Sequence, residues 1–217
     1  MDIPNLEEEN VVSTYNKIAL LFSETRGKPW DWIQYFIKSL PNNSSILDIG
    51  CGNGRNMTNL LKGQNLTFKG VDSCQKFVDI AVKNGKDAVL SDMCQLPFED
   101  NSFDAILSIA SFHHLSTPER CQKGLQEMLR VLKPGGKILM SVWSITQPKQ
   151  SRNYGKFKYG DNIVPWKNKK GEVEGERYYY IFQIKELTDL ILEKEFHITD
   201  WTWNYGNEVL HFQKPDN

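Results

Sequence analysis

The sequence predicts an α/β protein with a doubly wound, seven-stranded sheet, and three observations support that prediction. Apolar runs of strand length alternate with segments of helical spacing from Ser45 to Trp143, as expected for parallel strands joined by crossover helices. A glycine-rich turn follows the first strand, and a helix and a hairpin are expected after residue 182. We expect residues 1–217 to form a single domain with a sizeable core.

Two helices are expected before the sheet, within residues 1–44. The first covers about residues 7–22 and the second about residues 30–40, because apolar residues recur there at helical spacing. The break between them contains Arg26 and Trp30. On their own, these two residues are equally well explained as a surface arginine and a helix-packing tryptophan.

The first strand ends in an aspartate, Asp48, which is followed by three glycines at alternate positions. The loop consists of Gly50, Cys51, Gly52, Asn53 and Gly54. Glycine adopts positive φ without strain and has no Cβ, so a ligand can approach the backbone closely. Helical spacing over residues 56–62 predicts a helix directly after this loop.

Two further aspartates are expected at the same edge of the sheet. Asp72, followed by Ser73, closes the second apolar run 20 residues after Gly52, where α/β nucleotide sites place the carboxylate that binds the ribose hydroxyls. Asp92 and Met93 follow a short third strand at residues 87–91. The Asp92 carboxylate can accept a hydrogen bond from an exocyclic amine and the Met93 N–H can donate one to a ring nitrogen, although an aspartate in this position is also a common turn cap.

The fourth strand, residues 103–110, contains Ser108 and leads directly to His113 and His114. Ligands bind outside the carboxyl ends of the strands in such sheets. We therefore expect one histidine to point into the crevice and the other to pack. A helix capped by Thr117 and a fifth strand that ends at Trp143 follow.

Composition excludes several classes of function. The net charge of −1 gives no overall attraction to nucleic acid or to a membrane surface. The four cysteines have no Cys-x-x-Cys spacing, and the two adjacent histidines cannot both ligate one ion from a helix face, so we expect no metal site. The acidic N-terminus is unlike a signal peptide, and no apolar run has the length of a membrane span. We therefore expect no membrane contact and a cytoplasmic location, with the nucleus as a second compartment.

Residues 144–182 are expected to form an insertion on the substrate side of the sheet, largely as a loop. Between residues 149 and 170 there are seven basic residues and one acid, Asp161, with aromatic residues interleaved. This composition is typical of sites for single-stranded nucleic acid, although a solvated mobile loop is an equally open interpretation. The basic residues are Lys149, Arg152, Lys156, Lys158, Lys167, Lys169 and Lys170, and the aromatic residues are Tyr154, Phe157, Tyr159 and Trp166.

Several motifs together resemble one enzyme family. The spacing Asp-x-Gly-x-Gly-x-Gly differs from the dinucleotide pattern and is similar to motif I of the class I S-adenosylmethionine (SAM) methyltransferases. The whole set resembles the eukaryotic tRNA methyltransferases that esterify 5-carboxymethyluridine at the wobble position, among them fungal tRNA methyltransferase 9 and the methyltransferase domain of its vertebrate AlkB-type relative. The motifs are Thr25-Arg-x-Lys-Pro-Trp30, Asp48-Ile-Gly-Cys-Gly-Asn-Gly54, Ser108-Ile-Ala-x-x-His-His114, Val164-Pro-Trp166 and Arg177-Tyr-Tyr179.

The resemblance implies a fold, a reaction and a set of site residues. The fold would be the class I SAM methyltransferase fold. The reaction would convert 5-carboxymethyluridine to 5-methoxycarbonylmethyluridine in the tRNA anticodon, with SAM as cofactor and S-adenosylhomocysteine as product. The implied catalytic residues are Arg26, His113 and Arg177, and the implied substrate-binding residues are Trp30, His114, Trp143, Trp166 and Tyr178. The implied cofactor-binding residues are Asp48, Gly50, Cys51, Gly52, Asn53, Gly54, Asp72, Ser73, Asp92, Met93 and Ser108.

The resemblance also implies a partner, a small zinc-binding activator subunit that several methyltransferases share. We expect it to add a strand to the sheet edge near residues 87–91, where Val89 and Leu90 would otherwise be exposed. Two other functions stay open at this point. A small-molecule C- or O-methyltransferase of the quinone or sterol type would cover its site with an apolar lid at residues 150–180, and a non-catalytic SAM-binding subunit would bind the cofactor without transferring methyl.

Overall fold

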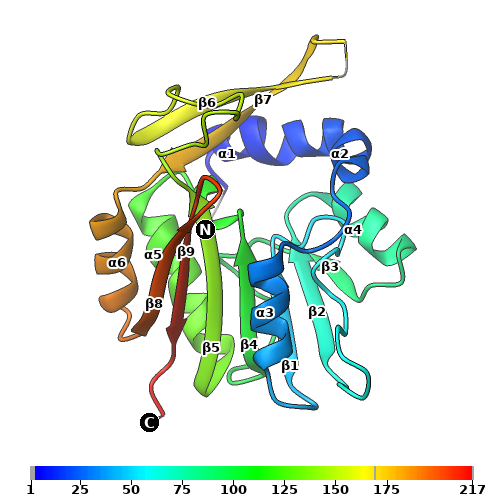
Figure 1. The fold of residues 1–217 in the computed structure, drawn as a ribbon, viewed down its shortest axis with the longest axis vertical. Coiled ribbons are helices and arrows are strands. Elements are labelled where there is room, and N and C mark those ends of the chain that lie inside the picture. The colour runs from blue at the N-terminus through cyan, green and yellow to red at the C-terminus, as the bar shows by residue number, and fades with distance from the viewer. Residues whose placement is uncertain (1–2, 169, 217) are drawn as a thin grey trace.

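A computed structural model describes residues 3–168 and 170–216. Its main sheet has seven strands in the order β3-β2-β1-β4-β5-β9-β8 (Figure 1). The first five strands in the chain run parallel to one another, and the last two form a hairpin whose strand β9 pairs antiparallel with β5. The strands are β1 (Ser45–Ile49), β2 (Thr67–Asp72), β3 (Ala88–Leu90), β4 (Phe103–Ile109), β5 (Leu132–Trp143), β8 (His197–Asn204) and β9 (Asn207–Gln213). The predicted fold class is confirmed.

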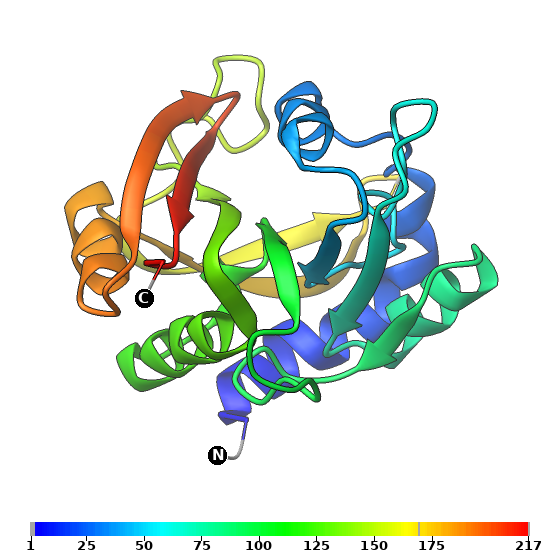
Figure 2. The same ribbon diagram turned by 90° about the horizontal axis from the view of Figure 1, so that it is seen from below.

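Helices cover the two faces of the sheet unequally (Figure 2). One face is covered by α4 (Gln75–Lys83), α5 (Pro118–Val131) and α6 (Ile184–Leu192). On the other face, α3 (Asp31–Ser39) packs Ile33, Phe36 and Ile37 against β1, β4, β5 and β9. α5 begins as the sequence predicts, because Thr117 accepts the Arg120 N–H at 3.3 Å and Pro118 occupies the first turn.

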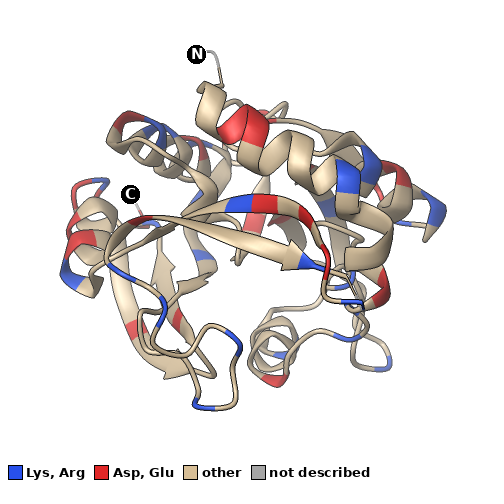
Figure 3. Ribbon diagram, turned by 90° about the horizontal axis from the view of Figure 1, so that it is seen from above, with Lys and Arg blue, Asp and Glu red and all other residues tan. Residues whose placement is uncertain are grey.

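A roof crosses the carboxyl ends of the parallel strands (Figures 1 and 3). Its inner part is the N-terminal segment, which consists of α1 (Asn5–Glu7), a π-helical stretch (Glu8–Ser13) and α2 (Thr14–Glu24). Its outer part is a two-stranded antiparallel ribbon of β6 (Gly160–Lys167) and β7 (Val173–Ile181). The two parts are in direct contact, because the Thr14 hydroxyl donates to the Glu176 carbonyl at 2.9 Å and a Cβ on Gly175 would lie 2.8 Å from Thr14 Cγ2.

Two predicted elements differ in the structure. Residues 56–62 form turns and extended chain rather than a helix, so the glycine loop does not lead into a helix N-terminus. Residues 144–182 were expected to be largely loop, but residues 160–167 and 173–181 form the ribbon. Of the basic residues in this insertion, Lys169 lies outside the described residues.

Within the described part of the chain, no helix has the length and apolar character needed to cross a bilayer.

Candidate functional site

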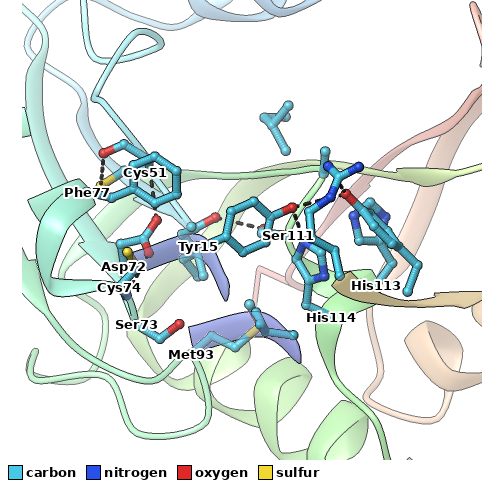
Figure 4. Close-up of a pocket in the computed structure, with 18 of the residues that line it drawn as sticks. Tyr15, Cys51, Asp72, Ser73, Cys74, Phe77, Met93, Ser111, His113 and His114 are labelled. Carbon is cyan, nitrogen blue, oxygen red and sulfur yellow. Dashed lines mark hydrogen bonds between the residues drawn. The ribbon is translucent and has the colours of Figure 1, made fainter. Parts of the chain in front are cut away.

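A cavity of about 340 Å³ lies between the carboxyl ends of the strands and the N-terminal segment (Figure 4). This volume is within the roughly 300–1,000 Å³ that small-molecule sites occupy. The glycine loop, the ends of β2 and β3, and the histidine pair line its floor. From above, the N-terminal segment contributes Glu7 from α1, Val11 from the π-helical stretch and Tyr15 from α2. In Figure 4, Tyr15 lies between a group containing Asp72 and Phe77 and the two histidines. The cavity therefore has two ends, which Tyr15 separates.

The glycine loop brings backbone to the cavity. Gly50 has φ +73° and passes so close to Ser111 that a Cβ would collide with the Ser111 side chain. Gly52 has φ +55° and nothing within 4 Å of the position of a Cβ, so the space beside it is open to a ligand. Gly54 is different, because its missing Cβ faces Lys86 and it does not line the cavity. Asn53 lines the cavity and donates to the Arg26 carbonyl at 3.0 Å, which fixes the loop to the break before α3.

Asp72 lies at the end of β2 and lines the cavity, as predicted from its position after the strand. Its two carboxylate oxygens accept the N–H groups of Gly52 and Cys74, each at 2.9 Å. Burial raises its pKa to about 6, although these two hydrogen bonds favour the ionised form. Each oxygen keeps a second lone pair, so Asp72 can still accept a hydrogen bond from a ligand hydroxyl.

Asp48 lies behind the loop and is completely buried without lining the cavity. Neither of its carboxylate oxygens has a hydrogen-bond partner among the described residues. Burial raises its pKa to about 7, against the opposing effects of nearby Asn56 and Arg55. An uncompensated buried carboxylate directly behind a ligand loop favours a cationic ligand in front of it.

Asp92 and Met93 line the cavity next to β3. One Asp92 oxygen accepts the Cys94 N–H at 2.9 Å and the other pairs with Arg120 at 2.7 Å. Arg120 also pairs with Glu7 at 2.9 Å, and Glu7 in turn accepts from the Ser116 N–H and hydroxyl. Glu7 and Arg120 are both buried, so this chain of charges fastens the N-terminal segment across the Asp92 end of the cavity.

The two histidines are fixed in opposite tautomers. His113 Nδ1 accepts the Trp143 N–H at 2.9 Å, which leaves the proton on Nε2 when the ring is neutral. His114 Nδ1 lies 2.7 Å from the Tyr178 carbonyl and must donate to it, which leaves Nε2 as the acceptor of the Tyr15 hydroxyl at 3.1 Å. Burial lowers the pKa of both rings, to about 3 for His114, so both are neutral. Within the described chain, His113 Nε2 has no partner, which makes it a free donor on the cavity wall.

Two arginines and two aromatic rings form the end of the cavity beyond Tyr15. Arg177 is buried, donates from Nη1 to the Tyr179 hydroxyl at 2.7 Å, and has no partner for Nε among the described residues. Tyr179 stacks on Trp143 with ring centroids 4.0 Å apart and an interplanar angle of 7°. Arg26 lies over the Phe22 ring at 4.5 Å, and burial lowers its pKa. This end therefore offers cationic donors beside a flat aromatic wall.

A second hollow of about 740 Å³ adjoins the cavity under the ribbon. The two share Arg26, Trp143, Asn153 and Arg177 as lining residues. The other lining residues of the hollow include basic and aromatic side chains, Arg152, Lys156, Phe157, Trp166 and Lys167, beside neutral residues of the ribbon. Figure 3 shows basic segments on the loop below the ribbon and both acidic and basic segments on the ribbon itself, where Glu174, Glu176 and Arg177 lie on β7. Basic residues thus occur both on the loop and on the ribbon, where Lys167 ends β6.

The structure separates the predicted residues into two groups. Lining the cavity are Arg26, Trp30, Gly50, Cys51, Gly52, Asn53, Asp72, Ser73, Asp92, Met93, His113, His114, Trp143 and Arg177. Gly54, Asp48 and Ser108 lie behind the wall, and the Ser108 hydroxyl contacts Ser111 at 3.1 Å rather than the cavity. Trp166 lines the second hollow instead.

One of the substrate-side predictions, Tyr178, needs correction, and the hydrogen bonds of a second, His114, limit how it could contact a substrate. Tyr178 is fully buried in the cluster formed with α2 and α4, and its hydroxyl donates to Asp161, so it cannot contact a substrate. His114 lines the cavity, but both of its nitrogens are occupied within the protein. The sequence reasoning missed Tyr15, Tyr179 and Asn207, which line the cavity, and the ion pair of Glu7 with Arg120.

Residues 47–140 match the methyltransferase domain family. The chain is 38% identical to the tRNA (carboxymethyluridine(34)-5-O)-methyltransferase of Schizosaccharomyces pombe, over 85% of this chain and 87% of that protein. It is 39% identical to the protein of the same name from Arabidopsis thaliana, over 66% of this chain and 35% of that protein. It is 42% identical to the tRNA (carboxymethyluridine(34)-5-O)-methyltransferase ALKBH8 of Mus musculus, over 65% of this chain and 21% of that protein. The chain thus spans most of the fission-yeast relative and about a third or less of the other two.

Solved structures with the same fold are more distant in sequence. The CcbJ methyltransferase of Streptomyces caelestis has a TM-score of 0.75 at 13% identity and covers 94% of this chain and 98% of that one. A Methanosarcina mazei SAM-dependent methyltransferase has a TM-score of 0.68 at 20% identity and covers 88% of this chain and 100% of that one. A Haloferax volcanii methyltransferase, solved in complex with the Trm112 methyltransferase activator, has a TM-score of 0.67 at 15% identity. The match covers 95% of this chain and 98% of that one.

Proposed function

Because the chain belongs to the family of tRNA (carboxymethyluridine(34)-5-O)-methyltransferases, which are SAM-dependent, we propose that it esterifies the carboxylate of 5-carboxymethyluridine at the tRNA wobble position. The predicted family, fold and cofactor are confirmed. One observation carries the proposal of the acceptor. The cavity and the basic, aromatic hollow meet at a common wall of Arg26, Trp143 and Arg177, so a nucleotide in the hollow can reach a cofactor in the cavity.

The residues around the cavity fit SAM. The open space beside Gly52 admits a ligand next to the loop backbone, and the unpartnered carboxylate of Asp48 behind that loop favours a positively charged group. Asp72 would hold the ribose hydroxyls, and Asp92 with the Met93 backbone would hold the adenine. When bound, SAM supplies an electrophilic methyl group on a sulfonium centre.

The acceptor side needs binding and alignment more than proton transfer. A carboxylate has a reference pKa near 4 and is already an anionic nucleophile at neutral pH, so no general base is required. The guanidinium groups of Arg26 and Arg177 match a carboxylate or phosphate, and the Nε2–H of His113 can donate to a carbonyl or carboxylate oxygen. Trp143, backed by Tyr179, offers a flat surface for the uracil ring. Holding both reactants at attack distance supplies much of the rate enhancement.

An assay of methyl transfer tests this proposal. Labelled SAM is incubated with the chain and with tRNA that lacks the ester, in the presence and in the absence of the activator subunit. We expect the tRNA to become labelled and mild base to release that label, because a methyl ester hydrolyses in base and a C- or N-methyl group does not. Arg26→Lys is expected to lower transfer while leaving cofactor affinity unchanged. Label that survives base, or transfer only to small quinone- or sterol-like acceptors, would replace the proposal with the small-molecule alternative. Cofactor binding without transfer to any acceptor would indicate a non-catalytic subunit.

We further propose that a small zinc-binding activator docks on the open edge of β3. The support is that β3 has a single strand neighbour in the sheet and that the exposed fractions of Val89 and Leu90 are 40% and 52%. An open edge of this kind is a template for β-augmentation. The fold relative from Haloferax volcanii forms a complex with the Trm112 methyltransferase activator.

The hydrogen-bond pattern identifies the residue to test. The Asp87 carbonyl and the Ser91 N–H both pair with β2. Since neighbouring residues in a strand point their backbone groups to opposite sides, Val89 also points to β2 and Leu90 points to the open edge. Leu90→Pro removes one outward donor and is expected to abolish the complex in a co-purification assay. Trp201→Pro on the opposite edge strand β8 should not, because the Trp201 N–H also lies outside the ladder and donates to the side chain of Asp200. A complex that forms equally well with Leu90→Pro would contradict docking at β3.

A further inference from the structure

A continuous chain of hydrogen bonds runs from Arg177 to the backbone of its own strand by way of the N-terminal helix. Arg177 Nη1 donates to the Tyr179 hydroxyl at 2.7 Å, and the Tyr179 and Tyr15 hydroxyls are 3.0 Å apart. The Tyr15 hydroxyl lies 3.1 Å from His114 Nε2, and His114 Nδ1 lies 2.7 Å from the Tyr178 carbonyl. We call these four side chains, Arg177, Tyr179, Tyr15 and His114, the relay.

The direction of every bond in the relay is determined by its two ends. A guanidinium only donates, so Tyr179 accepts from Arg177. At the other end the Tyr178 carbonyl only accepts, so His114 carries its proton on Nδ1 and its Nε2 accepts from Tyr15. The Tyr15 oxygen is then left to accept from Tyr179. Both hydroxyl protons are used inside the relay, and neither is available to a ligand.

We propose that Tyr15, Tyr179 and His114 are positioning residues that hold Arg177 with its Nη1 turned into the protein and its Nε edge turned toward the acceptor. The proposal rests on the proposed function, because it assigns Arg177 to the acceptor carboxylate. Arg177 Nε is buried and has no hydrogen-bond partner within the described chain. The Nε edge of the guanidinium is therefore available to a ligand. The planar guanidinium has only one orientation that satisfies the bond to Tyr179 and presents this edge.

Tyr15 makes the orientation of Arg177 depend on the N-terminal helix. Tyr15 belongs to α2, and its ring packs edge-on against Phe22 at 5.5 Å and beside Phe77 at 5.8 Å. These contacts lie on the Asp72 side of the cavity, as Figure 4 shows for Phe77. The packing of α2 over the cavity therefore places the hydroxyl that completes the relay, and the orientation of Arg177 depends on that packing.

Tyr15→Phe is the first test, because it removes one hydroxyl and keeps the packed ring. We expect kcat/KM for tRNA to fall about tenfold, as is typical for loss of one buried hydrogen bond, with the Kd for SAM unchanged. In an Arg177→Lys background the same substitution should have no further effect, because Tyr15 acts through the guanidinium. Tyr180→Phe is the matched control, since Tyr180 lies on the same strand and loses a comparable hydrogen bond to Glu186 at 2.6 Å outside the relay.

The second test needs no RNA. Imidazole ¹⁵N spectra of the full chain are expected to show His114 protonated on Nδ1 and His113 on Nε2, two opposite tautomers on neighbouring residues. Tyr15→Phe should shift the Nε2 resonance of His114 and the Arg177 Nε resonance, whereas Tyr180→Phe should shift neither.

The two tests separate the proposals. If the wild-type chain fails to methylate tRNA but shows these tautomers and shifts, the relay stands and the acceptor assignment falls. An Nε2-protonated His114, or an Arg177 resonance that Tyr15→Phe leaves in place, overturns the relay. Equal losses from Tyr15→Phe in the wild-type and Arg177→Lys backgrounds overturn the positioning role as well.

Discussion

Replacing Asp48 by asparagine is expected to stabilise the free protein above neutral pH and to weaken its binding of SAM. Burial raises the pKa of Asp48 from 3.8 to about 7, and each pKa unit corresponds to about 1.4 kcal/mol. The ionised carboxylate therefore costs the folded state about 4 kcal/mol at pH 8. Asparagine removes the charge but keeps an unpartnered polar group, which costs about 1–3 kcal/mol. The net gain is about 1–3 kcal/mol.

The pH dependence has a definite sign. The folded state keeps the Asp48 proton that the unfolded chain releases above pH 4, so this group contributes stability at low pH that is lost as the pH rises through 7. The advantage of Asp48→Asn over the wild type should thus grow by about 2–3 kcal/mol between pH 5 and pH 8, as measured by urea unfolding.

Asp104→Asn serves as the control of opposite sign. Asp104 lies at the far end of β4, and although partial burial opposes it, hydrogen bonds from Lys133 and Ser45 lower its pKa. Its replacement should cost stability at pH 8 and cost less as the pH falls. Calorimetry should show about tenfold weaker SAM binding for Asp48→Asn alone, as expected when a nearby opposite charge is lost. An unfolding free energy difference for Asp48→Asn that is the same at pH 5 and pH 8 would refute the reasoning.

Three further predictions concern other parts of the site. Glu7→Ala leaves the buried Arg120 paired with Asp92 alone and should cost about 2–3 kcal/mol, less than the loss of a sole partner, which lowers Tm by about 5–10 °C; a shift below about 2 °C in calorimetry would contradict the buried pair. Lys156→Glu should raise KM for tRNA and reduce the salt dependence of binding by about one or two counterions, with the KM for SAM as the internal reference. Trp143→Leu should lower kcat/KM for tRNA by about tenfold or more, since stacking on a base contributes about 1–3 kcal/mol; unchanged kinetics would exclude stacking on this ring.

Most of the sheet could be predicted from the sequence because most of the parallel strands, such as β1 and β4, contain a short apolar run. The prediction of a helix at residues 56–62 was wrong for a physical reason. Met57 and Leu60 have helical spacing, but Met57 packs against Cys51 in a small cluster under the loop and Leu60 packs with α3. Two separate cores produced a periodicity that resembles one helical face.

The sequence identifies the cavity residues that lie at or near the ends of strands. It does not identify those whose position depends on contacts between distant parts of the chain. Asp72 and His113 come directly after strands and lie in the cavity. Glu7 and Arg120 are far apart in the sequence, and no local pattern connects them. Tyr179 could have been found, because alternation along a strand places it on the same side as Arg177 and places Tyr178 on the other. An expectation of loop in this segment concealed that signal.

The position of α3 has a practical consequence for the choice of expression fragments. The chain between β1 and β2 has no helix to cover the adjacent face of the sheet, and α3 supplies Ile33, Phe36 and Ile37 there instead. A fragment that starts at Ser45 would retain every strand and every cofactor carboxylate, yet leave one side of the sheet bare to water. A minimal methyltransferase unit cut from a longer relative should therefore begin upstream of the segment equivalent to α3, even though all the glycine and aspartate motifs lie downstream of it.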